Sequence, residues 1–124
     1  MPSAIYVIPT EGLDDGEILD SVLVKNLKPG PGSRCIILPE AGQGRPHPRV
    51  DAIYVVTDRV EAEEPGWDWE LALDRIGCPQ KPRWYDITEA LARDGLVAMT
   101  IAHGDGCRID HPASVALIWA ALGW

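Results

Sequence analysis

The residues best suited to chemistry lie close together in the last quarter of the sequence. Two histidines, two aspartates and one cysteine fall within nine positions: His103, Asp105, Cys107, Asp110 and His111. Imidazole, carboxylate and thiolate groups all bind zinc and related metals, so His103 and His111 are candidate metal ligands. The spacing His-x3-Cys-x3-His matches no established zinc pattern. The cofactor is therefore undetermined, with a divalent metal as the candidate.

The same segment also offers a nucleophile. Cys107 is a candidate nucleophile, with His103 or His111 as its base and Asp105 or Asp110 orienting that base. A purely structural interpretation stands beside this one. Glycines flank Asp105 and favour an ordinary turn, and Asp110 is a candidate N-cap for the helix that follows. The segment 103–111 is thus either a catalytic or metal-binding loop, or a turn followed by a helix cap.

Two other segments are candidates for ligand binding. Gly44, Arg45 and Arg49 lie in a Gly- and Pro-rich stretch whose amides and guanidinium groups suit an anion. Thr10 and Glu11 directly follow the first expected strand, where ligands bind in α/β sheets. Neither segment contains a complete phosphate-binding glycine motif, so a nucleotide is only weakly indicated. The structural alternatives are a connector tip and a plain turn.

The aromatic composition points to surfaces where one chain meets another. The sequence contains five Trp and three Tyr but no Phe. Trp and Tyr have an apolar body with a polar edge, and both are enriched at protein interfaces. The candidate interface residues are Trp67, Trp69, Trp84, Trp119 and Trp124. The alternative is that these rings pack at the edge of the core.

The acidic charge narrows the class of partner. Eleven Lys and Arg against 19 Asp and Glu give a formal net charge of −8. Such a chain is repelled by phosphate backbones and by anionic lipid surfaces, so nucleic acid and membranes are disfavoured. A basic protein partner is compatible with this charge, although acidic residues also serve simply to keep a small domain soluble.

Cysteine usage and hydropathy bear on localisation. The three cysteines form no disulfide framework, which fits a reducing compartment. No apolar run approaches the ~20 residues that a membrane span requires, and the first residues lack the features of a secretory signal. We therefore expect a cytoplasmic protein.

The hydrophobic pattern predicts how these residues are positioned. Apolar, β-branched runs predict strands at 4–8, 34–38, 50–57 and 96–102. Helical spacing predicts helices at 17–27, 68–76 and 112–122, although the last segment also alternates as a strand would. Asp86 and Glu89 resemble a capping box that opens a further helix ending before Gly95.

These elements predict one α/β domain spanning residues 1–124. The expected order β-α-β-β-α-α-β-α favours a mixed or mostly parallel four-stranded sheet covered by helices. The length is typical of a single domain, and no linker or internal repeat divides it.

One loose resemblance to a known family rests on the sequence PHPRVDAIYVVTDR, the later LVAMTIA and the apolar C-terminus. Together these segments are similar to phage tail-terminator or neck proteins. The resemblance implies ring-forming contacts between copies and no catalytic site. It covers about half of the chain and departs from the family at the start, where a strand replaces the usual helix.

The sequence therefore favours a non-enzymatic module that binds a protein partner or assembles with itself. The alternatives are a small hydrolase or metal-dependent enzyme acting on a nucleotide or phosphate ligand through 103–111, and an acidic inhibitor or immunity-type protein that binds a basic partner.

Overall fold

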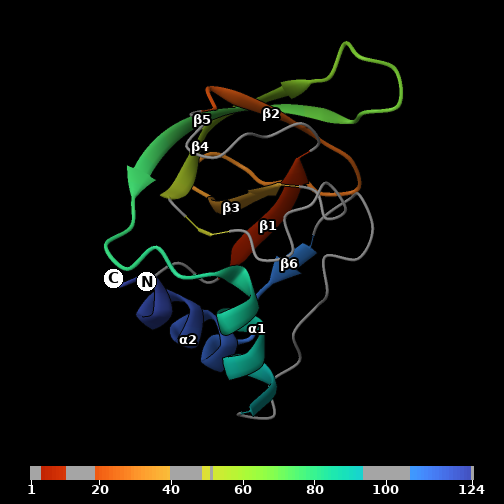
Figure 1. Ribbon diagram of the computed structural model, residues 1–124. Helices are drawn as coiled ribbons and strands as arrows, with labels where there is room; N and C mark the ends of the chain where they lie inside the picture. The colour runs from red at the N-terminus through yellow and green to blue at the C-terminus, as the bar shows by residue number, and fades with distance from the viewer. Residues whose placement is uncertain (1–3, 11–18, 40–48, 51, 94–106, 124) are drawn as a thin grey trace.

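A computed structural model describes residues 4–10, 19–39, 49–50, 52–93 and 107–123 (Figure 1). The strands are β1 (Ile5–Thr10), β2 (Ser21–Val24), β3 (Arg34–Pro39), β4 (Ala52–Glu61), β5 (Trp69–Gly77) and β6 (Cys107–Ile109). The helices are α1 (Trp84–Arg93) and α2 (Pro112–Leu122).

All six strands belong to one mixed sheet with the order β2-β5-β4-β3-β1-β6. Only β1 and β3 are parallel, and every other pair is antiparallel. The expected four-stranded sheet covered by helices is therefore wrong. The described chain has six strands and two helices, and the helices cover only part of one face.

Two predicted helices are strands, and the two errors are coupled. Residues 21–24 and 69–72 pair with each other as β2 and the first half of β5. Val22 and Val24 point to one face together with Leu71, which satisfies a strand period of two. Helical spacing within each segment was overridden by pairing between segments that lie far apart in the sequence.

Other predicted elements are confirmed. The strands at 4–8, 34–38 and 50–57 are found as β1, β3 and β4, and the helix at 112–122 is found as α2. Helix α1 begins at Trp84, so Asp86 lies in its first turn and is not an N-cap. The expected strand at 96–102 and the cap at Gly95 lie outside the described residues.

The two faces of the sheet carry separate cores. One core joins α1 and α2 to the sheet; its central residues are Ile5, Val7, Ile36, Leu38, Ile53, Trp84, Ile87, Leu91, Val115, Ile118 and Leu122. The other face holds Ile8, Val22, Val24, Cys35, Ile37, Tyr54, Val56, Leu71 and Leu73.

The second core spans the five strands from β1 to β2 in the sheet order. The sheet therefore curls around this core, and β2 and β5 arch over β3 and β1 (Figure 1). The face that carries the helices is the convex one. No residue of β2 or β5 belongs to the helix-covered core, and β4 contributes to it only Ile53.

Candidate protein-interaction surface

The predicted site at 103–111 is only partly within the described chain. His103 and Asp105 lie outside the described residues. Cys107 opens strand β6 opposite Val7, so the expected loop is wrong from this residue to Ile109. Asp110 is exposed and its Oδ2 accepts a hydrogen bond from Nη1 of Arg108 at 2.9 Å.

The start of helix α2 has no side-chain cap. His111 occupies the N-cap position with an extended backbone, and its side chain makes no capping hydrogen bond. Pro112 takes the first helical position, where the missing N–H has no cost. The prediction of Asp110 as N-cap is therefore wrong. Within the described ranges, no group of three or more His, Cys, Asp or Glu residues is placed to hold a metal ion.

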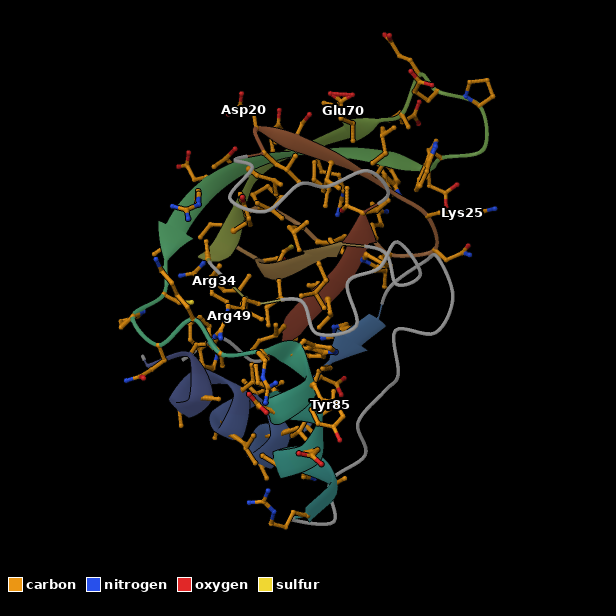
Figure 2. All side chains as sticks on the ribbon, viewed as in Figure 1. Asp20, Lys25, Arg34, Arg49, Glu70 and Tyr85 are labelled. Atoms are coloured by element: carbon orange, nitrogen blue, oxygen red, sulfur yellow. The ribbon has the colours of Figure 1, made fainter. Side chains whose placement is uncertain are left out.

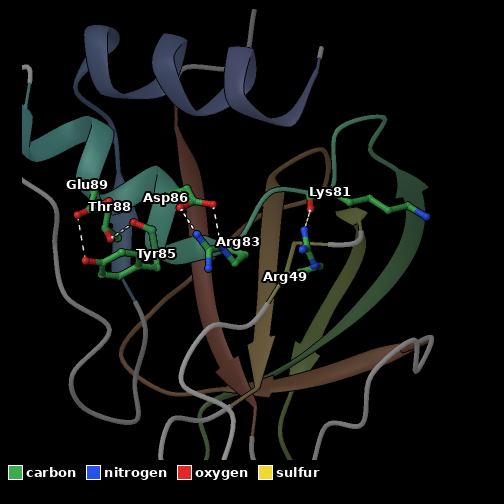
Figure 3. A network of polar contacts seen from close by, with 7 residues as sticks. All are labelled: Arg49, Lys81, Arg83, Tyr85, Asp86, Thr88 and Glu89. Atoms are coloured by element: carbon green, nitrogen blue, oxygen red, sulfur yellow. Dashed lines mark hydrogen bonds and ion pairs between the residues drawn. The ribbon is translucent and has the colours of Figure 1, made fainter.

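The structure describes Thr10 and Arg49 but not the other predicted ligand-binding residues. Thr10 ends β1 beside Pro39, and its buried Oγ1 has no hydrogen-bond partner in the described part of the chain. Glu11, Gly44 and Arg45 lie outside it. Arg49 is exposed, and its Nη1 donates to the carbonyl of Lys81 at 3.1 Å (Figure 3). The structure therefore does not bring Thr10 and Arg49 together at one described site.

The tryptophans have different surroundings. Trp84 is only 8% exposed and packs in the helix-covered core, which leaves little of its side chain available for an interface. Trp119 is partly buried against the same core, and Trp124 lies outside the described residues. Trp67, in the loop between β4 and β5, is 41% exposed. Trp67 thus fits the interface prediction best.

Polar contacts around the start of α1 are local and structural. The carboxylate of Asp86 accepts two hydrogen bonds from the Arg83 guanidinium, at 2.9 and 3.0 Å (Figure 3). The hydroxyl of Tyr85 donates to Oε1 of Glu89 at 2.9 Å, and this bond raises the pKa of the Tyr85 phenol. A phenol held in its protonated form is poorly suited to act as a base, so these contacts orient the first turn of α1.

The most distinctive exposed surface lies on the convex face of the sheet, beyond the helices. Cross-strand partners share a face, so the pairs of β2, β5 and β4 define it. One row places Glu70 between Leu23 and Val60; the next places Ala72 opposite Asp58; a third places Asp74 opposite Val55. Ile76 follows, opposite the buried Ile53. We call these residues the acidic convex surface: Leu23, Val55, Asp58, Val60, Glu70, Ala72, Asp74 and Ile76.

This surface combines exposed apolar side chains with acidic ones. Val60 is 51% exposed and Ile76 is 37% exposed, whereas the buried valines and isoleucines of the sheet are below 10%. Asp58, Glu70 and Asp74 are all exposed. Glu70 lies at the end of the molecule opposite the helices in Figure 2. An exposed apolar patch rimmed by polar or charged residues is a feature of surfaces that bind proteins.

Arg34 lies on the same face, because it pairs with Val55, and its Nη1 donates to the carbonyl of Gly32 at 2.7 Å. Two other nearby cations lie on the opposite face. Arg59 pairs with the buried Leu71, so its side chain belongs to the concave side. Its guanidinium lies 4.9 Å from the ring centre of Trp69, and Nζ of Lys28 lies 5.1 Å from the same centre. Nη1 of Arg59 also donates to the carbonyl of Lys28 at 3.1 Å. These contacts hold the chain segment after β2 against the β4–β5 hairpin. The charged side chains that the hairpin itself directs to the convex side are Asp58, Glu70 and Asp74.

The sequence contained a signal for this surface that helical spacing obscured. Trp69, Leu71 and Leu73 alternate with Glu70, Ala72 and Asp74, as expected for a strand with one solvated face. Assigned to a helix, Glu70 and Asp74 share a side but Ala72 does not. Assigned to a strand, they place two acids and an alanine together.

Comparison with family models, with curated proteins and with solved structures gives no match. The resemblance to phage tail-terminator or neck proteins has no support from these comparisons. Among the described helices, neither is long and apolar enough to cross a membrane. The case for a function therefore depends on the geometry of the acidic convex surface.

Proposed function

We propose that this chain is a non-enzymatic interaction module that binds a basic protein through the acidic convex surface. The observation that carries the proposal is the half of the convex face that the helices do not cover, where exposed Val60 and Ile76 stand beside Asp58, Glu70 and Asp74. Carboxylates attract a cationic partner over long distances, and the apolar side chains contribute once the surfaces touch.

The charge of the acidic convex surface favours a basic partner over a second copy of this chain. A two-fold contact between two acidic convex surfaces would place Asp58, Glu70 and Asp74 of one copy against the same acids of the other. Like charges brought together at an interface cost free energy. A partner with Lys or Arg around an apolar centre meets no such penalty, so we expect the surface to bind a different protein.

Nuclear magnetic resonance with a defined probe tests this proposal. We suggest adding a short peptide of alternating lysine and valine to isotope-labelled protein, with a peptide of alternating glutamate and valine as control. The basic peptide should shift the amide signals of Leu23, Val60, Glu70 and Ala72 in a saturable way, and the acidic peptide should not. Shifts confined to α1 and α2, or equal shifts with both peptides, would contradict the proposal.

A further inference from the structure

We infer that Arg34 sets the orientation of the bound partner, which places a basic group over Asp74 and an acidic group over Arg34. This inference rests on the proposed function and specifies the charge pattern of the partner. It comes from one row of the sheet, in which Val55 pairs with Asp74 of β5 on one side and with Arg34 of β3 on the other.

Register and burial place the three side chains of this row on one face. Cross-strand partners point to the same face of a sheet. Arg34 lies two residues before Ile36 in β3, and Val55 lies two residues after Ile53 in β4. Both isoleucines belong to the core beneath the helices, so Arg34 and Val55 also lie on the convex face. The row therefore passes from an acid, through a partly buried valine, to a cation.

The turn before β3 holds the guanidinium of Arg34 at the border of the acidic convex surface. Nη1 of Arg34 donates to the carbonyl of Gly32 at 2.7 Å, and the amide of Gly32 donates to the carbonyl of Val56 at 2.7 Å. Arg34 is partly exposed, and Figure 2 shows it between Glu70 and the helices. The bond to Gly32 uses one of the five N–H groups of the guanidinium, and the fork geometry of this group suits a carboxylate.

The two charges of the row act on a partner separately. Neighbouring strands lie ~4.8 Å apart, which separates the backbones at Asp74 and Arg34 by roughly 10 Å. No ion pair joins these two described side chains. A partner with basic groups along its whole length would meet repulsion at Arg34, whereas an acidic group at that end would be attracted. Opposite charges arranged in this way fix the orientation and specificity of a complex.

Two peptides of equal composition test the inference. Both are the lysine–valine peptide with two lysines replaced by glutamate, at one end in the first peptide and at the centre in the second. The parent protein should bind the end-acidic peptide about threefold more tightly, which is the contribution of one exposed ion pair. Unequal affinity in the opposite direction, or equal affinity, would overturn the inference.

Matched variants assign this preference to a residue. Arg34→Gln removes the charge and keeps a donor for the carbonyl of Gly32. Arg75→Gln removes a charge from the concave face, where Arg75 pairs with the buried Tyr54. The preference for the end-acidic peptide should disappear in Arg34→Gln and persist in Arg75→Gln, with the circular dichroism spectrum of the parent kept in both. The same preference in both variants would refute the role of Arg34.

A spin label on the acidic end of the first peptide reports its orientation on the parent protein, without a variant. It should broaden the amide signals of Ser33 and Arg34 more than those of Glu70 and Ala72. Equal broadening of the two pairs, with binding at the acidic convex surface retained, would leave the proposed function standing and refute the orientation. If neither peptide shifts the signals of this surface, the proposed function fails, and the inference fails with it.

Discussion

The buried thiol of Cys35 shows how the core limits the chemistry of a single residue. Cys35 has no exposed surface, and burial raises the pKa of its thiol to about 12. The thiolate is the reactive form of cysteine, so this side chain is unsuited to act as a nucleophile near neutral pH. Its role is to fill space between Tyr6 and Tyr54 on the concave face, where it is their cross-strand neighbour.

This pKa predicts how stability changes at alkaline pH. Below the unfolded pKa of about 8.5, both states carry the neutral thiol and its contribution is constant. Above that value the unfolded chain releases the proton and the folded chain keeps it, so the free energy of unfolding falls by up to ~1.4 kcal/mol per pH unit until about pH 12.

Urea unfolding of the parent and of Cys35→Ala, measured at several pH values from neutral to alkaline, checks this prediction. The parent should lose stability more steeply above about pH 9. Because lysines and tyrosines titrate equally in both proteins, their effect cancels in the difference. Parallel curves would show that Cys35 ionises in the folded protein as readily as in the unfolded one.

The tryptophans illustrate what residue type alone can and cannot predict. Composition correctly indicated that some rings would lie at the surface, and Trp67 does. It could not distinguish Trp67 from Trp84, which is buried because the three-residue step to Ile87 places both on the inner side of α1. Nor could it place Lys28 and Arg59 over the ring of Trp69, since that contact depends on the pairing of β4 with β5.

At the scale of elements, strand pairing was the information that the local pattern lacked. The segments with the strongest β-branched character, β1, β3 and β4, were predicted from the sequence. β2 and β5 were not, because the apolar residues in and around each strand also fit a helical spacing when the segment is taken alone. Pairing between Val22 and Leu71 selects the strand form of both segments, and with it the acidic convex surface.

The end of helix α2 provides a prediction about packing between elements. Gly123 has a φ of 90° and its amide donates to the carbonyl of Ala120, as in a left-handed helix cap. A Cβ at this position would lie 3.2 Å from Cβ of Pro79 and 3.3 Å from the backbone nitrogen of Gln80. The glycine therefore allows both the left-handed backbone and the close approach of the turn before α1.

We expect Gly123→Ala to destabilise the fold by about 2–4 kcal/mol, from the left-handed backbone and the crowding combined. Gly66→Ala is the matched control, because Gly66 has a φ of 87° and open space around it. It should cost only about 1 kcal/mol. Chemical denaturation of both variants checks the difference. Equal losses would show that Pro79 and Gln80 move away from the added methyl group without cost.

At the scale of the whole molecule, the two helices and the curl of the sheet divide the convex face into two parts. One part is closed by α1 and α2 over β6, β1 and β3 (Figure 1). The other, over β4, β5 and β2, has no described cover and carries three acids around exposed apolar side chains. Net charge from composition favours a basic partner, and the three-dimensional arrangement indicates the surface through which we propose that it binds.

A comparison of two charge-reversal variants tests the account most directly. Glu70→Lys with Asp74→Lys alters the acidic convex surface, whereas Glu63→Lys with Glu64→Lys makes the same change in net charge within the exposed loop between β4 and β5. The measurement is the affinity of each double variant for the lysine–valine peptide at low and high salt.

We predict that the Glu70 and Asp74 pair weakens binding about tenfold at low salt, roughly 1.4 kcal/mol, and flattens its salt dependence. The Glu63 and Glu64 pair should weaken binding much less. Equal losses from the two pairs would show that only the net charge attracts the peptide, and would contradict a binding site on the acidic convex surface.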